Sequence, residues 1–468
     1  MSKQQPVSWE PRSFQMDGVV LCIKQACAGL LYKPGLGKTS VIYMAFRILQ
    51  DKRYVDKMLV VCPLRPAYVV WPHQKDMFTE FQHFKVNVLH GPDKETLLED
   101  DSADIYVINP EGLPWLFGWD STKNRVDKAR AEYVAKKFPM LVVDEASKFR
   151  DSSTRRFKIM RQVVPKFKRR YILNGSFRPK SLIDLFGQIY ILDEGHALGR
   201  YVTNYRTKYF YPSGYGGYDW TPLPHAPKEI AEKIAPLTHV VEQKGNVELP
   251  ELLFNNIQIE FDTVTMRRYK NMEADMVAEI GEGKIVAANA AVASGKCRQI
   301  CNGALYAEEG KWTDIHDLKL DALGDLIEEL NGDPLLISYE FQFDMERIKK
   351  RFGFPCISTG NIKNDTKIIQ EFASGNHIAV MGQSQSISLG TDGLQNSCSN
   401  IAMLGLPWSF LTYEQLIDRV KRQGSKSSSV TIHRIVAKDT IDERVIKVLH
   451  GHDREQTAFM RMLRQARG

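Results

Sequence analysis

The stretch from Leu30 to Thr39, LLYKPGLGKT, has the residue types and spacing of a loop that binds phosphate. A short apolar run leads into a tight Pro-Gly turn, and Lys38 and Thr39 then open a segment with helical periodicity. In such a P-loop, backbone N–H groups and a helix N-terminus face an anion, the lysine neutralises phosphate charge, and the hydroxyl is placed to bind Mg²⁺. The sequence therefore predicts that a nucleoside triphosphate is bound by Pro34, Gly35, Leu36, Gly37, Lys38, Thr39 and Ser40.

The loop departs from the strict pattern G-x-x-x-x-G-K-[ST], because Tyr32 stands where the first glycine is expected. An ordinary glycine-rich turn between a strand and a helix is the alternative interpretation. The remainder of the chain has to decide between the two.

A carboxylate pair supplies the second half of a triphosphate site. Asp144 and Glu145 directly follow the apolar run Met140–Val143, so they are expected at the carboxyl edge of a sheet, where ligands bind in α/β folds. We predict that Asp144 holds Mg²⁺ together with Thr39, and that Glu145 orients or deprotonates the attacking water. An acidic helix cap is the alternative. The position of the pair after the loop and before a basic run favours the catalytic interpretation.

Three polar residues near the C-terminus share one helical face. Gln415, Arg419 and Arg422 are spaced four and three residues apart. A planar guanidinium group can donate two hydrogen bonds at once to phosphate oxygens. An arginine that reaches the γ-phosphate typically raises the rate of hydrolysis by ~10³–10⁵. We predict that both arginines are catalytic and that Gln415 lies at the nucleotide. A basic stripe on the surface is the alternative.

Short apolar runs of strand length alternate with stretches of helical spacing, which predicts two α/β units with parallel sheets flanked by helices. We place an N-terminal domain at residues 1–245, with an insertion at about 198–230, and a C-terminal domain at 246–468. The second domain contains a helical insertion at about 264–310 and ends in one or two helices over 440–467. The run from Tyr201 to Trp220 is rich in Tyr, Gly and Pro, so we expect neither a regular helix nor a central strand there. The expected strands are Ala28–Tyr32, Met58–Cys62, Ile105–Ile108, Met140–Val143, Tyr171–Leu173, Leu335–Tyr339, Ile378–Met381, Ile401–Leu404 and Val430–Val436.

Composition narrows the class of protein. A chain of 468 residues is too long for one ordinary hydrophobic core, so more than one domain is expected. Its content of 43% apolar and 25% charged residues is typical of a globular protein. No apolar run approaches the ~20 residues of a membrane span, and the N-terminus lacks the apolar core of a signal peptide. Seven cysteines without C-x-x-C spacing favour reduced thiols. We therefore expect a cytoplasmic protein without a membrane partner.

Positive charge is concentrated between Ser152 and Arg170, where eight basic residues occur and no acidic one. This local potential is sufficient to hold a polyanion such as a nucleic-acid backbone. A solvated helix face is the alternative.

Taken in order, these motifs resemble those of the Swi/Snf-like branch of superfamily-two helicases and translocases, particularly the compact versions found in phages. That branch also lacks the first glycine of the phosphate loop. In the acidic box, Ser147 replaces the usual histidine. A further motif departs from Thr-Gly-Thr-Pro at Asn174, Ser176 and Phe177, which leaves its role in coupling hydrolysis to DNA undecided. The matching stretches are FQ at 14–15, GLGKT at 35–39, VVCPLRPAYVVWPHQ at 60–74, VVDEASKFRD at 142–151, ILNGSFRPK at 172–180, GTDGLQ at 390–395 and QLIDRVKR at 415–422.

The resemblance implies two RecA-like domains with ATP at their interface and DNA lying across both. It assigns adenine recognition to Gln15 and adds Gly390, Asp392 and Gly393 to the nucleotide site. It also implies DNA contacts from Pro63, Arg65, Lys148, Arg150, Arg155, Arg156 and Arg178.

The implied activity is that of an ATP- and Mg²⁺-dependent DNA helicase or translocase that moves on duplex or branched DNA. The expected work is remodelling of forks or Holliday junctions by branch migration, in phage replication and recombination. Phage replication and recombination proteins are the expected partners, and the protein is expected to act as a monomer or loose oligomer, in the host cytoplasm if a phage encodes it. The alternatives are a double-stranded DNA translocase that displaces proteins without separating strands, a nucleic-acid-binding scaffold with a silent ATP site, and an RNA helicase.

Overall fold

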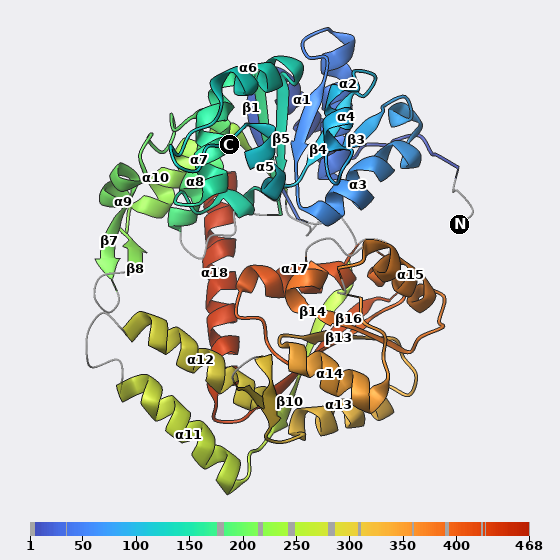
Figure 1. Cartoon of the computed structure of the whole chain (residues 1–468), viewed down its shortest axis with the longest axis vertical. Coiled ribbons are helices and arrows are strands. Elements are labelled where there is room, and N and C mark those ends of the chain that lie inside the picture. The colour runs from blue at the N-terminus through green and yellow to red at the C-terminus, as the bar shows by residue number, and fades with distance from the viewer. Residues whose placement is uncertain are drawn as a thin grey trace. The chain divides into compact units, whose positions relative to one another are not determined.

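The computed structural model of the chain describes residues 5–33, 35–175, 182–213, 219–241, 249–278, 286–307, 310–357, 360–388, 393–422, 425 and 427–467. The chain forms two compact units (Figure 1). The first comprises Met1–Asn246 together with Arg454–Gly468, and the second comprises Val247–Asp453.

A seven-stranded parallel sheet forms the centre of the first unit, in the order β3-β4-β2-β5-β6-β1-β9. Strands β1, β2, β4, β5 and β6 coincide with predicted strands to within one or two residues at each end. Their central residues are buried, as expected for strands covered on both faces. The bounds are β1 (Cys27–Tyr32), β2 (Met58–Val61), β3 (Val86–Val88), β4 (Ile105–Ile108), β5 (Met140–Asp144), β6 (Arg169–Asn174) and β9 (Thr238–Val241).

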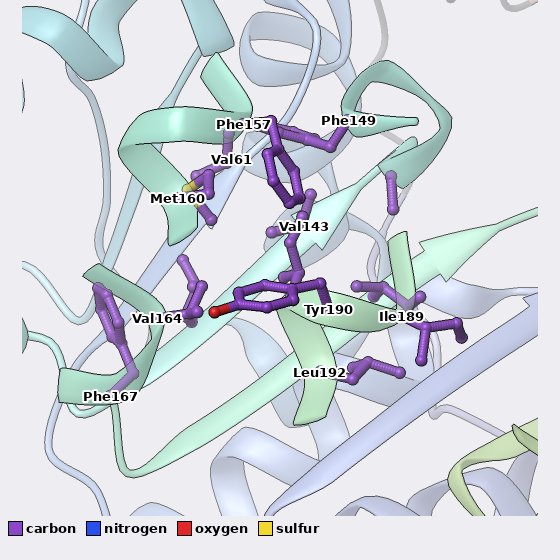
Figure 2. Packing of buried hydrophobic residues seen from close by; sticks show 14 of the residues in the cluster. Val61, Val143, Phe149, Phe157, Met160, Val164, Phe167, Ile189, Tyr190 and Leu192 are labelled. Atoms are coloured by element: carbon purple, nitrogen blue, oxygen red, sulfur yellow. The ribbon is translucent and has the colours of Figure 1, made fainter. Parts of the chain in front are cut away.

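Helices flank this sheet and close its core. In one part of the core, Val61 and Val143 of the sheet meet Phe157 and Met160 of α7 and Tyr190 of α8, whose side chains point toward one another (Figure 2). The helices are α1 (Ser13–Lys24), α2 (Lys38–Asp51), α3 (Leu64–Met77), α4 (Lys94–Glu99), α5 (Leu113–Leu116), α6 (Lys128–Lys137), α7 (Arg155–Val163), α8 (Leu185–Asp193) and α10 (Ala226–Ile234).

The second unit contains a five-stranded parallel sheet in the order β10-β16-β15-β13-β14. The chain therefore consists of two tandem RecA-like units, and the predicted fold class is confirmed. The strands are β10 (Glu251–Ile259), β13 (Leu335–Tyr339), β14 (Ala379–Gln383), β15 (Asn400–Met403) and β16 (Ser429–Ala437), with a small antiparallel pair, β11 (Ala304–Tyr306) and β12 (Trp312–Asp314). The helices are α11 (Thr263–Ala278), α12 (Val286–Asn302), α13 (Leu318–Glu329), α14 (Gln342–Phe352), α15 (Ile362–Ala373), α16 (Ser384–Ser388) and α17 (Phe410–Val420).

The run from Tyr201 to Trp220 contains more regular structure than its composition predicted. It forms helix α9 (Val202–Tyr209), followed by the antiparallel strands β7 (Phe210–Ser213) and β8 (Asp219–Pro222). The expectation that no regular helix forms here was wrong. Pro and Gly are confined to the later part of the run, and Tyr205 and Tyr209 in the earlier part are buried against the core. Aromatic residues there serve packing in a helix.

The C-terminal helix α18 (Ile441–Arg467) also differs from expectation. The sequence placed the whole stretch on the second domain, but Phe459, Met460 and Leu463 are buried in the core of the first unit. An amphipathic pattern predicts that one face of a helix is buried, but it does not determine which unit buries that face. Among the described residues, no helix combines the length and apolarity that a bilayer crossing requires.

Candidate functional site

The predicted phosphate loop connects β1 to α2 and contains two glycines in the left-handed region. Gly35 has φ +84° and Gly37 has φ +75°, and Gly37 caps the N-terminus of α2. A Cβ atom on Gly37 would lie 2.3 Å from the Gln15 side-chain nitrogen, and the left-handed backbone adds strain for any other residue, so glycine is favoured there. Lys38 Nζ donates to the Tyr32 carbonyl at 2.8 Å. Pro34 lies outside the described residues.

Gln15 is held directly against this loop, although it precedes it by many residues. Its Oε1 accepts from the Arg12 N–H at 2.9 Å, and its Nε2 donates to the Leu36 carbonyl at 3.2 Å. The side chain is buried. The structure therefore brings together Gln15 and the glycine turn.

Asp144 is the last residue of β5, and it lies at the same sheet edge as the loop. Strand β6 lies between β5 and β1, and its Leu173 pairs with Asp144 on one side and with Leu30 on the other. Asp144 and Leu30 are therefore at the same level along their strands. Burial, together with the neighbouring Glu145, raises the pKa of Asp144 to about 6, and Lys38 and a hydrogen bond from Trp71 oppose this shift. Lys38 therefore lies within electrostatic range of the Asp144 carboxylate, while its ammonium group is bound to the Tyr32 carbonyl.

Glu145 adopts a left-handed backbone conformation, with φ +56° and ψ +53°. This conformation costs a residue other than glycine about 1–3 kcal/mol and persists where the surroundings fix it. Its N–H donates to Asp144 Oδ1 at 3.1 Å, and a short 3₁₀ turn, Ala146–Phe149, follows. Backbone strain of this kind is typical of functional sites.

Helix α3 supplies contacts to this site that the sequence did not predict. Trp71 Nε1 donates to Asp144 Oδ2 at 3.1 Å, and the Ser40 hydroxyl donates to Gln74 Oε1 at 2.7 Å. Tyr43 of α2 stacks on Trp71 and donates to its carbonyl at 2.5 Å. A signal was available, since Trp71 and Gln74 are three residues apart and so share a helix face. The resemblance, however, implies DNA contacts from the start of this segment, at Pro63 and Arg65, and says nothing of Trp71 or Gln74.

The divergent motif at the end of β6 contacts the acidic box. Asn174 Oδ1 accepts from the Ser147 N–H at 3.3 Å, and Asn174 Nδ2 donates to Gln188 Oε1 at 2.6 Å. Both Asn174 and Gln188 are buried. The remainder of the motif, residues 176–181 with Arg178, lies outside the described residues.

In the second unit, the predicted arginines lie on α17 and directly after it. Arg419 donates from Nε and from a terminal nitrogen to the Ser388 carbonyl, at 3.1 and 2.6 Å. Arg419 thus holds the end of α16, next to the segment that contains Gly390 and Asp392, which lies outside the described residues. Gln415 is buried on α17, and Gly393 has φ +100°. The structure therefore places Gln415, Arg419 and Gly393 in the second unit and the phosphate loop in the first.

The described residues that were predicted to face DNA form two groups in the first unit, one at the start of α3 and one in the 3₁₀ turn and the start of α7. Pro63 caps the N-terminus of α3, directly after β2, and Arg65 lies in the first turn of that helix. Arg155 opens α7 and is exposed. Burial lowers the pKa of Lys148, and Arg156, together with Arg150, acts in the same direction.

The basic run does not form one continuous surface. Arg169 donates to the Cys22 carbonyl at 3.1 Å, and Arg170 donates to the Val164 carbonyl at 2.9 Å and pairs with Glu194. These two arginines connect β6 to neighbouring elements, so the expectation that the whole run faces a polyanion was wrong at its C-terminal end.

A protein-family model matches part of the chain. The family model described as the res subunit of type III restriction enzymes matches residues 21–176. This stretch contains the phosphate loop, the acidic pair and Asn174.

Two relatives align with most of the chain. A protein of Acyrthosiphon pisum secondary endosymbiont phage 1 is 27% identical over 429 residues, which cover 88% of this chain and 90% of the relative. An uncharacterized ATP-dependent helicase of Mycoplasma genitalium is 23% identical over 459 residues, which cover 93% of this chain. The chain spans 41% of the length of that second relative.

Two solved structures are similar along nearly the whole chain. The SWI2/SNF2 ATPase core of Sulfolobus solfataricus in complex with dsDNA has 19% sequence identity and a TM-score of 0.43, and the match covers 98% of this chain and 96% of that one. The ATPase core domain of the same protein has the same identity and TM-score, with 96% and 91% covered.

Proposed function

We propose that this chain is an ATPase of the superfamily-two helicase type, which couples ATP hydrolysis to movement along duplex or branched DNA. One observation carries the proposal. The half-buried Asp144 carboxylate ends the central strand β5, at the same sheet edge as the loop that carries Lys38, and its pKa is raised to about 6. A carboxylate with a raised pKa and a glycine loop with a lysine, at the same carboxyl edge of a parallel sheet, form an arrangement suited to phosphoryl chemistry.

The residues present fit a Mg²⁺-nucleotide. The N–H groups of the glycine turn and the N-terminus of α2 favour phosphate, and a hydroxyl and a carboxylate, from Thr39 and Asp144, are the oxygen ligands that Mg²⁺ prefers. When bound, Mg²⁺ would neutralise charge that develops on the phosphates. Lys38 would exchange the Tyr32 carbonyl for phosphate oxygens, and Glu145 would orient the attacking water and accept its proton. Arg419 and Arg422 would donate to the γ-phosphate from the second unit.

We propose that DNA contacts three short segments: the start of α3 with Pro63 and Arg65, the 3₁₀ turn with Lys148 and the following Arg150, and the first turn of α7 with Arg155 and Arg156. Contacts of this kind address the phosphate backbone, so binding is expected to be independent of sequence and to weaken with salt. We further propose remodelling of forks and four-way junctions by branch migration, in phage replication and recombination. The likeness to a phage protein supports this setting.

ATPase assays with different nucleic acids test the proposal. Hydrolysis should be stimulated by DNA, most strongly by fork or four-way junction, and less by single strands, blunt duplex or RNA. Lys38→Ala should abolish it, because the lysine neutralises phosphate charge in the transition state. Lys52→Ala, at the opposite end of α2, is the matched control and should retain activity.

The same assays separate the alternatives. Activity without any response to DNA contradicts a translocase, and hydrolysis that survives Lys38→Ala contradicts the proposed ATP site. Displacement of a bound protein from duplex without strand separation would indicate a duplex translocase. Absence of hydrolysis on every substrate would indicate a scaffold with a silent site.

A further inference from the structure

Tyr32, which occupies the position of the missing loop glycine, is completely buried. Its hydroxyl lies 3.2 Å from the Phe14 carbonyl and 2.7 Å from His239 Nδ1. Its ring meets both aromatic rings edge-on, with centroids 5.8 Å from Phe14 and 5.4 Å from His239. A carbonyl can only accept, so the hydroxyl donates to Phe14 and accepts from His239 Nδ1–H. One side chain therefore connects α1 to β9 beneath the loop.

Two glycines permit this close approach. A Cβ atom on Gly18 would lie 2.0 Å from the Tyr32 hydroxyl, and one on Gly37 would lie 2.3 Å from the Gln15 nitrogen. Helix α1 is thus held against β1 at Gly18 and against the loop at Gln15. Tyr32 takes part on both sides, because its hydroxyl binds the residue before Gln15 while its carbonyl accepts from Lys38.

The orientation of the Gln15 carboxamide determines which base it can recognise. In this structure, Oε1 accepts from Arg12 and Nε2 donates to Leu36, and each group retains capacity for one further hydrogen bond. Adenine presents a donor and an acceptor side by side, whereas guanine presents two acceptors. An amide held in one orientation can distinguish them, and an amide free to shift or flip distinguishes them less well.

We propose that Tyr32 is a positioning residue that fixes α1, and with it Gln15, over the phosphate loop, so that the site prefers adenine nucleotides to guanine nucleotides. His239 anchors the Tyr32 hydroxyl from β9. This inference rests on the proposed function, since it concerns the same nucleotide site. It assigns a role to the residue by which the loop departs from the strict phosphate-loop pattern.

The chain offers a matched control at the opposite end of α1. The buried Tyr171 hydroxyl donates to the Cys22 carbonyl at 2.6 Å, which is also a tyrosine bond to the backbone of α1. Cys22 lies about two helical turns beyond Gln15. Tyr32→Phe and Tyr171→Phe therefore each remove one buried hydrogen bond to the backbone of α1. Only the bond from Tyr32 lies beside Gln15.

The experiment compares kcat/KM for ATP and GTP in the full chain, at saturating DNA, together with thermal unfolding. Tyr32→Phe should reduce the ATP-to-GTP ratio about fivefold to tenfold, the effect of one buried hydrogen bond, mainly through a higher KM for ATP. Both variants should lower the midpoint of thermal unfolding by similar amounts, because each loses one buried hydroxyl. Tyr171→Phe, however, should leave the ATP-to-GTP ratio unchanged. His239→Gln provides a second route, because it weakens the anchor and leaves the tyrosine ring in place.

A double variant tests whether the effect passes through Gln15. Gln15→Ala should remove most of the preference, and adding Tyr32→Phe should remove no more. The inference is overturned if Tyr32→Phe and His239→Gln retain the wild-type ratio, if Tyr171→Phe changes it equally, or if the wild type has no preference between the bases. None of these results affects the proposed function, which fails separately if the wild type does not hydrolyse ATP.

Discussion

At the scale of single residues, the hydrogen bond from Trp71 to Asp144 is the contact that bears most directly on the proposed Mg²⁺ site. The indole N–H donates to one carboxylate oxygen at 3.1 Å, and Tyr43 stacks on the indole from the other side. Partners that orient a metal ligand are typically worth 10- to 100-fold in metal affinity. We therefore propose that Trp71 is a positioning residue, which would act on the proposed metal site through Asp144.

Trp71→Phe removes this donor and keeps an aromatic ring beside Tyr43. We expect the Mg²⁺ concentration for half-maximal ATPase activity to rise about tenfold, because Asp144 loses the bond that orients it. The measurement is a Mg²⁺ titration of DNA-stimulated ATPase activity. Trp115→Phe is the control, since Trp115 also donates its indole N–H to a carboxylate, that of Glu95, at the surface. An unchanged Mg²⁺ dependence in Trp71→Phe would contradict the assignment.

The sequence predicted the site residues that follow strands directly, and it missed those that reach the site through packing. Lys38 and Asp144 could be predicted because each has a fixed place in a local pattern: Lys38 follows the glycine turn, and Asp144 directly follows an apolar run. Trp71 lies 73 residues before Asp144. Their contact depends on how α3 packs beside the sheet, which local spacing does not determine. Tyr32 was noticed only as a departure, because its partner His239 lies 207 residues further along the chain.

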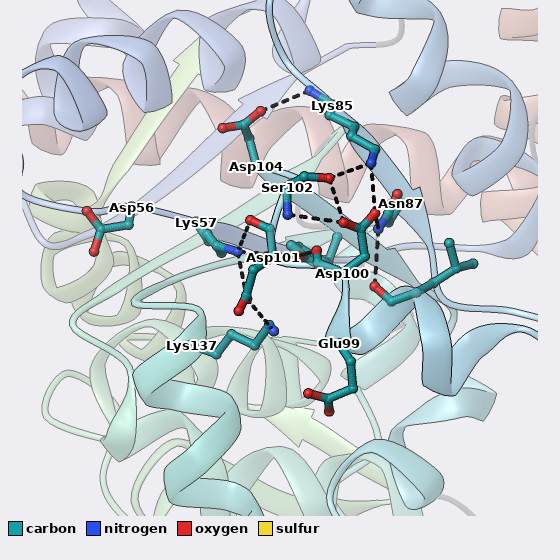
Figure 3. A network of polar contacts seen from close by, with 12 residues as sticks. Asp56, Lys57, Lys85, Asn87, Glu99, Asp100, Asp101, Ser102, Asp104 and Lys137 are labelled. Carbon is teal, nitrogen blue, oxygen red and sulfur yellow. Dashed lines mark hydrogen bonds and ion pairs between the residues drawn. The ribbon is translucent and has the colours of Figure 1, made fainter.

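At the scale of elements, a polar network fixes the turn between α4 and β4 at the amino ends of the strands (Figure 3). Asp100 accepts from Lys85 Nζ at 2.8 Å and from the Ser102 N–H at 3.1 Å. Asp101 pairs with Lys57 and Lys137, at 3.0 and 2.7 Å. These contacts connect the beginnings of β2, β3 and β4 with α6, so the network fixes the spacing of the sheet on the side opposite the candidate site.

Asp100→Asn should therefore destabilise the protein in a way that depends on pH. Hydrogen bonds from Lys85, Ser102 and Asn87 lower the pKa of Asp100 below its usual 3.8. A carboxyl with a lowered folded-state pKa stabilises the fold above the unfolded value, and this contribution is lost as pH falls through the folded value. We expect a lower urea midpoint for the variant at pH 7, and a smaller difference from the wild type as the pH falls below about 4.

Asp56→Asn is the matched control for this variant. Asp56 is exposed near the same strand ends, and its carboxylate makes no hydrogen bond or ion pair with the residues that the structure describes. The control should behave as the wild type at both pH values. A loss of stability in Asp100→Asn of equal size at pH 7 and pH 3 would show that shape, and not charge, is responsible.

The elements that the sequence missed lack a continuous apolar run. Strand β3 contains the buried Asn87, whose amide donates to the Leu97 carbonyl and to Asp100. A polar residue in a strand of three breaks the pattern by which buried strands are recognised. Helix α9 was missed because the Pro and Gly residues that follow it led us to exclude a helix from the whole run, whereas its own Tyr205 and Tyr209 pack in the core.

At the scale of the whole molecule, α18 shows how sequence order and spatial unit diverge. The helix begins in the second unit, yet its last turns belong to the first. Leu463 is completely buried there, and Phe459 and Met460 are nearly so. The sequence predicted an amphipathic helix correctly, but the identity of the surface that covers it depends on contacts between residues at the two ends of the chain.

Leu463→Ala should therefore destabilise the first unit, although the residue follows the entire second unit in sequence. Truncation of a fully buried leucine typically costs about 2–5 kcal/mol, because the apolar contacts are lost and a cavity remains. The neighbouring Met462 is 39% exposed, so Met462→Ala on the same helix should cost much less. Urea unfolding, followed by hydrogen exchange in β1, β5 and β6, would assign the loss to the first unit. Equal effects of the two variants, or a loss confined to the second sheet, would mean that the last turns of α18 do not stabilise the nucleotide-binding unit.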